Sequence, residues 1–487
     1  MSPADTPRAK NLALALLAMT QFVVVLDAAI VNVALPSIGR DLDFARDDLS
    51  WVVNAYTLVF GGFLLLGGRL SDLLGRRRMF IWGMVLFAAA SLAGGLAQSD
   101  VWLVAARAVQ GLGAAIVSPA ALSIVTTTFT EGAERNRALG VWGAVAGSGG
   151  AAGVLLGGIL TETLGWEWVL FVNTPIGIAA ALLAPYLLGE SRDASSPSFD
   201  FAGAFSVTAG LALLVYTLVD ANDAGWGSSQ TLVLGAISLL LLAAFIAIES
   251  RRRYPLMPFS IFRLRTLRGA NVVGLLIGMS LFSMFFFISL YMQQVLDYGP
   301  LTAGLAYLPL ALTIIVSAGV ASQLVTRVGF KPPLIAGMLL VAAGLIWFGQ
   351  VSAPGGTYLG DILFPSLLAA VGLGFAFVPV TIAAVTGTRP AEAGLASGLI
   401  NTSQQVGGAL GLAVLATVAT GRTDDVFASG ERNPAVALTE GFQDAFLAGA
   451  GLALLGALLA AVLISSKDSR EHSEAARREG ATEPVAV

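Results

Sequence analysis

The sequence predicts an all-α polytopic membrane protein, on two observations. Of its 487 residues, 56% are hydrophobic and 12% are charged, and the mean hydropathy is +0.80. Soluble domains carry about 25% charged residues, so this composition suits a surface that faces lipid. Apolar runs long enough to span a bilayer also recur along the whole chain. Runs this long and continuous form helices, because a helix satisfies its own backbone hydrogen bonds in lipid.

The apolar runs form groups of six, two and six, which predicts fourteen transmembrane helices. The first six lie near Asn11–Leu35, Leu49–Gly67, Met79–Ala97, Val101–Phe129, Asn136–Leu160 and Trp168–Leu188. Two more lie near Phe201–Val219 and Thr231–Ile248. The last six lie near Gly269–Val295, Thr302–Leu324, Pro333–Val351, Ile362–Gly387, Gly394–Thr420 and Phe442–Ser465.

Lysine and arginine predict the orientation. With both termini placed in the cytoplasm, the predicted inner segments hold 22 of the 27 basic residues. Cytoplasmic loops of membrane proteins carry such an excess. Arg40, Arg46, Arg422 and Arg432 fall in predicted outer loops, and Arg107 lies within a span. Both ends of the chain are therefore expected on the inner side.

The two groups of six helices look like a duplication. The segment GRLSDLLGRRR (Gly68–Arg78) follows the second span, and SQLVTRVGFKP (Ser322–Pro332) follows the tenth. Both place a glycine and basic residues in a short inner loop, although Thr326 stands where the first copy has Asp72. Repeated helical halves packed around a central cavity are a common transporter architecture.

This pattern predicts five consecutive regions. They are an N-terminal six-helix bundle over 1–190, two additional helices over 191–250, a basic cytoplasmic linker over 251–268, a C-terminal six-helix bundle over 269–466, and a polar cytoplasmic tail over 467–487. The linker fits a lipid-headgroup anchor and topology signal better than a regulatory segment.

Composition excludes several kinds of chemistry. The chain has no cysteine, which excludes disulfides, thiolate metal sites and cysteine nucleophiles. Its one histidine, His472, lies in the polar tail, so proton chemistry inside the membrane falls to carboxylates. No phosphate-binding GxxxxGK[ST] loop is present, so uphill transport needs an ion gradient or a partner. We expect no enzyme activity, cofactor, metal or nucleic-acid partner.

Asp27 is the one carboxylate deep in an outer half-span, and Arg107 lies at similar depth in the fourth span. Unpaired, each charge would cost several kcal/mol, and together they can neutralise one another. Pairing favours the carboxylate, whereas burial favours the neutral acid, so a change in their separation would release or bind a proton. Two simpler interpretations remain: a static ion pair between two helices, or an Asp that only bonds a neighbouring helix.

The fifth span contains GSGGAAGVLLGG, in which Gly149, Gly153 and Gly157 are spaced by four residues. Small residues at that spacing form a smooth face that lets two membrane helices approach closely. Tight packing without any role in gating is an equally good interpretation.

Uncharged polar side chains cluster on other spans and are candidates for a substrate cavity. Such groups can orient a mostly apolar ligand, although hydrogen bonds between helices would explain them equally well. They are Asn54, Tyr56, Gln293, Gln294, Asn401, Gln404 and Gln405.

These motifs resemble the major facilitator superfamily, and specifically its fourteen-helix drug:proton antiporter branch. LDAAIVNVALP resembles the branch's helix 1 signature, with its acid at Asp27, and RAVQGLGAA resembles the helix 4 motif, with its arginine at Arg107. WEWVLFVNTPIG and ASGLINTSQQVGGALG are similar to its helix 6 and helix 13 signatures. The superfamily's inner-loop motif is matched by Gly68, Arg69, Asp72, Gly75 and Arg76, and the helix 5 exporter motif by Gly149, Gly153, Gly157 and Gly158.

Some positions depart from the branch's pattern. Val154 replaces the proline that normally follows the third glycine of the helix 5 motif, which puts a proline-set bend in doubt. Glu167 and Asp297 stand where the branch usually has arginine and glycine. The tenth span has no carboxylate, which favours neutral or monovalent lipophilic substrates over divalent cations.

The resemblance implies a monomeric, proton-coupled antiporter in a bacterial plasma membrane that exports amphipathic drugs, antibiotics or natural products. Two bundles would rock around a central cavity, and Asp72 with its neighbouring arginines would bridge them on the inner face. The alternatives are a metabolite transporter or facilitator on the same scaffold, and a membrane protein that transports nothing.

Overall fold

The computed structural model describes residues 6–44, 49, 51–192, 200–252, 255, 257–352, 355–389 and 392–482. Every regular element within those ranges is helical, so the predicted all-α class is confirmed. Arg46 and Arg253, which the sequence assigns to loops, lie outside the described residues.

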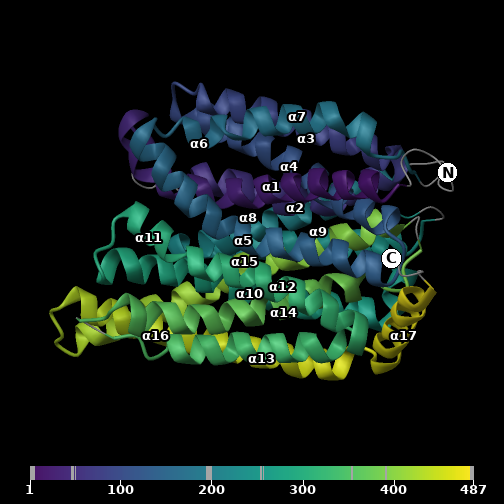
Figure 1. Cartoon of the computed structure of the whole chain (residues 1–487). Coiled ribbons are helices and arrows are strands. Elements are labelled where there is room, and N and C mark those ends of the chain that lie inside the picture. Colours follow the sequence, from purple (N-terminus) through teal and green to yellow (C-terminus); the bar gives the residue numbers. More distant parts are fainter. Residues whose placement is uncertain are drawn as a thin grey trace. The chain divides into compact units, whose positions relative to one another are not determined.

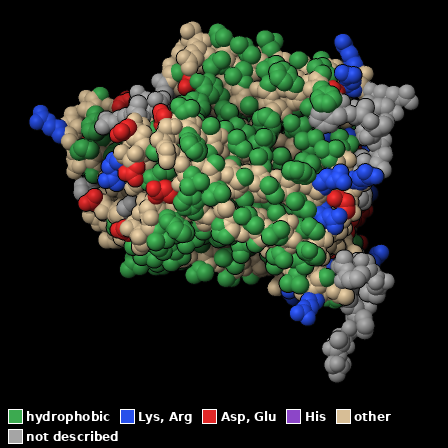
Figure 2. Space-filling view, turned by 90° about the horizontal axis from the view of Figure 1, so that it is seen from above, with side chains coloured by type: hydrophobic (Ala, Val, Ile, Leu, Met, Phe, Trp, Pro, Cys, Tyr) green, Lys and Arg blue, Asp and Glu red, His purple; other side chains and the backbone are tan. Residues whose placement is uncertain are grey.

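Thirteen helices within the described ranges are long and apolar enough to cross a membrane. The number reaches fourteen when the two arms of α5, Ala133–Gly150 and Ala152–Thr163, are taken as one span bent by 42°. Hydrophobic side chains cover the middle of the face shown in Figure 2, and charged side chains gather towards two opposite edges. Such an apolar surface suits lipid. The chain is therefore a multi-pass membrane protein.

The helices group into two compact units, each containing segments from both halves of the sequence. Unit 1 comprises residues 1–130, 156–264 and 387–402, and unit 2 comprises residues 131–155, 265–386 and 403–487. The helices α5 (Ala133–Thr163) and α15 (Ala393–Ala428) contribute residues to both units. The domain limits expected from the sequence stay a prediction.

The remaining elements of unit 1 are α1 (Pro7–Asp41), α2 (Trp51–Leu74), α3 (Arg76–Gly95), α4 (Asp100–Thr128), α6 (Trp168–Phe171), α7 (Asn173–Leu187), α8 (Phe201–Ala224), α9 (Ser229–Glu249) and the short η2 (Phe259–Arg263). Those of unit 2 are α10 (Arg265–Leu290), η3 (Tyr291–Val295), α11 (Pro300–Ala306), α12 (Leu308–Val328), α13 (Lys331–Phe348), η4 (Tyr358–Leu363), α14 (Phe364–Val385), α16 (Pro434–Leu463) and α17 (Ser466–Thr482).

Within unit 1, α4 packs between α2 and α3 at backbone distance. A Cβ atom at Gly111 would lie 2.5 Å from the carbonyl oxygen of Tyr56 on α2. A Cβ atom at Gly113 would lie 2.7 Å from the backbone nitrogen of Phe87 on α3. Glycine lets membrane helices approach this closely. The side chains that α4 carries one turn earlier are thereby enclosed by neighbouring helices, among them α1, α2 and α3 (Figure 1).

The sixth predicted span is built from two helices. The short α6 ends at Phe171, Val172 is not helical, and α7 begins at Asn173. Trp168–Leu187 together pass as one candidate span, which agrees with the predicted Trp168–Leu188. The break places the buried side chain of Asn173 at the beginning of α7.

The C-terminal segment that the sequence predicts as a polar cytoplasmic tail is folded mostly into α17. One side of α17 is buried through Ser469, His472, Ser473 and Ala476. These side chains are small or uncharged, so the helix can pack although most of its residues are polar. His472 is only 6% exposed.

Candidate functional site

Asp27 lies on α1 and is fully buried, and its carboxylate accepts three hydrogen bonds. Arg107 Nη1 donates to Oδ2 at 2.7 Å. Gln110 Nε2 and Asn173 Nδ2 donate to Oδ1 at 2.7 Å and 2.6 Å. Buried charges persist when they are paired and their remaining lone pairs are satisfied. The predicted pairing of Asp27 with Arg107 is therefore present as a contact between α1 and α4.

Arg107 is held by more than the ion pair. Its Nη1 also donates to Gln110 Oε1 at 2.6 Å, and its Nε donates to the carbonyl oxygen of Val52 at 3.0 Å. Its guanidinium carbon lies 4.4 Å from the centre of the Tyr56 ring, a cation–π contact. Gln110 Nε2 reaches the hydroxyl of Ser91 at 2.6 Å. The cluster thus joins five helices of unit 1: α1, α2, α3, α4 and α7.

All six side chains of this cluster are buried within unit 1. Bulk water therefore has no contact with the carboxylate in this conformation, and the attraction between the two charges is strong because little solvent screens it. A proton can exchange with Asp27 only after neighbouring helices move. The arrangement can hold a carboxylate without water and couple its protonation to helix movement.

Sequence reasoning found the two charges of the cluster and missed Gln110, Asn173 and Ser91. A signal existed for Gln110, which lies three residues after Arg107 and so on the same face of α4. Asn173 interrupts an apolar run, but a neutral amide there is equally compatible with an ordinary contact between helices. Nothing in the sequence singles out Ser91.

The residues of the Gly68–Arg78 motif gather at the beginning of α15, also within unit 1. Asp72 is fully buried and accepts from the backbone nitrogens of Gly394 and Leu395 at 3.0 Å and 2.9 Å. A carboxylate stabilises the first turn of a helix, where N–H groups have no partner within the helix. A Cβ atom at Gly68 would lie 2.5 Å from the carbonyl oxygen of Gly394, so only glycine allows this approach.

Two arginines of the motif are also buried. Arg76 pairs with Asp72 at 2.7 Å and donates to Ser191 Oγ at 3.1 Å. Arg69 is also buried, and its Nε atom has no partner among the described residues. Gly75 has a φ of +108°, a backbone conformation that favours glycine, and it connects α2 directly to α3.

The four glycines that match the helix 5 exporter motif are buried in α5. A Cβ atom at Gly157 would lie 2.7 Å from the carbonyl oxygen of Ile30, so α5 approaches α1 one turn beyond Asp27. Gly149, Gly153 and Gly158 are also buried. Their role in gating stays a prediction.

The predicted cavity residues are distributed over both units. Tyr56 belongs to the Asp27 cluster, and its hydroxyl donates to the carbonyl oxygen of Val24 at 3.3 Å. Asn401 Nδ2 donates to the carbonyl oxygen of Ser397 at 2.9 Å, as expected of an ordinary helix residue. Half-buried side chains are those of Asn54, Gln404 and Gln405, whereas Gln293 and Gln294 are exposed on η3. A shared role in substrate binding stays a prediction.

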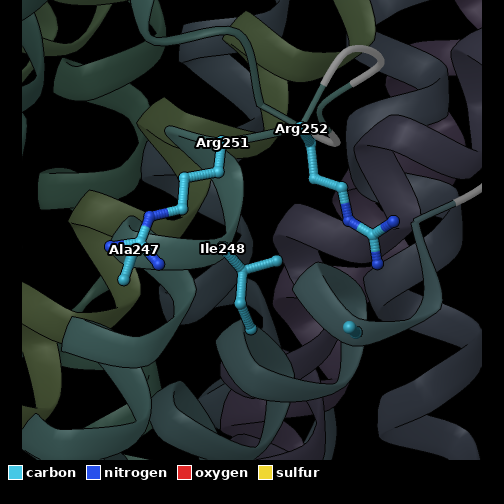
Figure 3. A pocket seen from close by; sticks show the side chains of 5 residues that line it. Ala247, Ile248, Arg251 and Arg252 are labelled. Atoms are coloured by element: carbon cyan, nitrogen blue, oxygen red, sulfur yellow. The ribbon is translucent and has the colours of Figure 1, made fainter.

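A separate pocket of about 270 Å³ lies at the ends of α8 and α9. It is lined by Ala202, Ala247, Ile248, Arg251 and Arg252. Figure 3 shows the two arginine side chains diverging on either side of Ile248. Arg252 is already paired with Asp200 at 3.4 Å. The pocket contains no residue of the Asp27 cluster and none of the predicted cavity residues.

Comparison with known proteins identifies the family. The model of the Major Facilitator Superfamily matches residues 17–412. The chain belongs to the Major Facilitator Superfamily. Solved structures with the same fold include the human organic anion transporter MFSD10 (TETRAN), with a TM-score of 0.67, 18% identity, and coverage of 93% of this chain and 100% of that one. The proton:xylose symporter XylE has a TM-score of 0.63, 15% identity, and coverage of 95% and 98%.

Several similar curated proteins are bacterial antibiotic resistance or export proteins. The cephamycin export protein CmcT of Amycolatopsis lactamdurans is 43% identical over 93% of this chain and 92% of that protein. The puromycin resistance protein pur8 of Streptomyces alboniger is 40% identical over 92% and 90%. The tetracenomycin C resistance and export protein of Streptomyces glaucescens is 38% identical over 83% and 75%. This superfamily member is a multi-pass protein of the bacterial inner membrane.

Proposed function

We propose that this protein is a proton-coupled antiporter that exports antibiotics or related amphipathic compounds. The observation that carries the coupling is the buried Asp27–Arg107 ion pair, which joins two helices of unit 1 out of contact with water. Export rather than import is supported by relatives named for resistance and export at 38 to 43% identity. The substrate class follows from the same relatives and from the uncharged character of the predicted cavity residues.

The cycle follows from the energetics of the pair. A proton arriving from the outer side neutralises Asp27 and leaves Arg107 without a counter-charge, a state that costs several kcal/mol in a buried site. Helix movement that lets water reach the guanidinium relieves this cost, and release of the proton to the inner side restores the ion pair. Each change of state alters access to a central cavity for a substrate moving in the opposite direction.

The finer architecture completes the proposal. Fourteen spans with both termini in the cytoplasm place Asp27 in the outer half and the Gly68–Arg78 motif on the inner face. Asp72 there caps α15, a helix from the second half of the chain, so the contact would hold the inner side closed. The transporter would act as a monomer, with α8 and α9 outside the transport core.

Vesicle transport tests the proposal directly. In inside-out proteoliposomes with an acidic lumen, we expect puromycin or a cephamycin to accumulate, because protons leave as the drug enters. Asp27→Asn should insert normally and lower gradient-driven accumulation at least about tenfold, since it removes the titrating group while keeping the side-chain shape.

Glu162→Gln is the matched control, because Glu162 is an exposed carboxylate at the end of α5. This control variant should transport like the unmodified protein. Undiminished gradient-driven transport by Asp27→Asn would refute the assignment of Asp27. Transport that ignores the gradient would instead support a facilitator.

A further inference from the structure

The two amides that hold Asp27 are not equivalent. Gln110 uses both ends: its Oε1 accepts from Arg107 Nη1 at 2.6 Å, and its Nε2 donates to Asp27 Oδ1 and to Ser91 Oγ. A half-turn of this amide would point its NH₂ group at the guanidinium, donor against donor. Gln110 is therefore fixed as a donor to Asp27.

Asn173 makes a hydrogen bond through only one end of its side-chain amide. Its Nδ2 donates to Asp27 Oδ1 at 2.6 Å. Its Oδ1 is buried and has no hydrogen-bond partner among the described residues. An unpaired buried acceptor costs about 1–3 kcal/mol, so a hydrogen-bond donor to this oxygen would stabilise the site. A half-turn about the Cβ–Cγ bond would exchange the two ends of the amide without breaking any other side-chain bond made by Asn173.

We propose that Asn173 is a positioning residue that serves both protonation states of Asp27. It donates to the carboxylate through Nδ2 and, after a half-turn, accepts the O–H of the protonated acid through Oδ1. This inference rests on the proposed proton coupling and adds a residue to it.

The position of Arg107 selects the oxygen that receives the proton. The guanidinium faces Asp27 Oδ2 at 2.7 Å and repels a proton there, so the incoming proton binds Oδ1. The new O–H donates to Asn173, while Gln110 continues to donate to a lone pair of the same oxygen. Asp27 takes up one proton and becomes neutral, while Asn173 and Gln110 neither gain nor lose a proton.

Protonation then affects the contacts of α1 unequally. The contact with α4 loses its charge–charge attraction, although Arg107 keeps Val52, Gln110 and the Tyr56 ring as partners. The contact with α7 keeps one hydrogen bond in both states. Proton binding therefore loosens α1 from α4 and leaves it attached to α7.

The test compares apolar replacements of the two amides, Asn173→Leu and Gln110→Met, in reconstituted protein. Infrared difference spectra would follow the carbonyl band of protonated Asp27, identified by its absence in Asp27→Asn, and transport would be measured over the same pH series. Gln110→Met removes a donor from both states of Asp27, and the bond to the charged carboxylate is about twice as strong as the bond to the neutral acid. The midpoint of the band should therefore rise by about one pH unit, the equivalent of about 1.4 kcal/mol.

Asn173→Leu removes one hydrogen bond from each protonation state. Its midpoint should therefore rise by less than about half of the shift in Gln110→Met, because the O–H of the acid loses its acceptor and this loss offsets much of the lost donor to the carboxylate. Its maximal transport rate should fall about tenfold, because both states of Asp27 lose a positioning contact. Asn173→Ser, whose hydroxyl can both donate and accept, should keep the midpoint and restore much of the rate.

An upward shift of the midpoint in Asn173→Leu equal to that in Gln110→Met would overturn the inference, because Asn173 would then be a donor only. Unchanged rate and midpoint in Asn173→Leu would overturn it as well. If Asn173→Leu does not fold, the same midpoint criterion applies to Asn173→Ala, which also removes both ends of the amide. Failure of the proposed function is distinguishable, because the Asp27 band and the gradient dependence of transport would then be absent from the unmodified protein.

Discussion

The Gly68–Arg78 and Ser322–Pro332 motifs make similar contacts with different side chains. In the first motif, the carboxylate of Asp72 accepts from the backbone nitrogens of Gly394 and Leu395 at the beginning of α15. In the second, Thr326 Oγ1 accepts from the side chain of Asn136 at 3.1 Å, near the beginning of α5. Each motif therefore holds the first turns of a helix within its own unit.

The residues one helical turn after Asp72 and Thr326 also differ in charge. Arg76 pairs with Asp72 in the first motif, whereas the aligned position of the second holds Phe330. Phe330 packs edge-on against His472 of α17, with ring centres 5.7 Å apart. His472 Nε2 lies 2.9 Å from Asn136 Oδ1. An aromatic pair and a neutral hydrogen bond thus replace the ion pair.

The helices that follow the two motifs, α3 and α13, also differ in the charge of the side chain that caps them. The carboxylate of Glu190 accepts from the backbone nitrogens of Arg77 and Arg78 at 3.2 Å, in the first turn of α3. In the first turn of α13, the hydroxyl of Ser469 accepts from the backbone nitrogen of Lys331 at 3.0 Å. An acid in the first copy again corresponds to a hydroxyl in the second.

The repeat keeps contacts with the beginnings of helices, the backbone caps of α3 and α13 among them, but not the charges. Unpaired N–H groups at a helix beginning need an acceptor whatever its charge. Hydrogen bonds to a charged group are about twice as strong as neutral ones. Contacts around Asp72 should therefore be harder to break than those around Thr326, and the neutral set contains the one group that titrates near physiological pH, His472.

Asp72→Asn should have the largest effect. It halves the capping strength at α15 and removes the carboxylate that pairs with the buried Arg76, which we expect to cost about 3 kcal/mol. The apparent Tm in detergent at a fixed scan rate should fall, and gradient-driven transport should drop at least about tenfold. Thr326→Val is the matched control in the second motif and should cost about 1 kcal/mol, the value of one neutral hydrogen bond. Equal losses in the two variants would contradict the comparison.

The sequence predicted the features that depend on composition and on depth in the membrane. It predicted fewer of the contacts that neutral side chains make. Long apolar runs placed the spans, because lipid forces such runs to be helical. Opposite charges at similar depth placed Asp27 near Arg107, because each is costly alone. Asn173 and Ser91 carry no comparable cost, so the sequence gives no reason to bring them to Asp27. The position of Thr326 in place of Asp72 suggests a degraded copy, and only packing shows that Asn136 and α17 supply the missing contacts.

The docking of α17 should weaken in acid, the next largest effect. Burial lowers the pKa of His472 below its usual value near 6.5, with Glu131 favouring and Arg135 opposing the charged form. The undocked helix therefore binds more protons than the docked one, and docking is at full strength above about pH 6.5 and is lost as pH falls below it. The expected loss approaches 1.4 kcal/mol per pH unit for one proton.

A spin label measures this docking. The chain has no cysteine, so Ala475→Cys, on the exposed side of α17, gives a single labelling site. Label mobility should increase between pH 7.5 and 5.5. His472→Gln keeps an N–H group for Asn136 and cannot titrate in this range, so its label should respond little to pH. The same response in both proteins would exclude His472 as its cause.

The smallest effect is expected for Ser469→Ala, which removes the hydroxyl cap of α13. Loss of a hydroxyl cap costs about 0.5–2 kcal/mol, and the low end applies here because Lys331 Nζ still joins α13 to the end of α16 through the carbonyl oxygen of Ile464 at 2.8 Å. Hydrogen exchange at the first turn of α13 should rise about threefold, as expected for a local loss of about 0.6 kcal/mol. Glu190→Ala should raise exchange more at α3, because it removes a charged acceptor from two N–H groups. A larger rise at α13 than at α3 would show that the neutral copy depends on its cap more than the charged one.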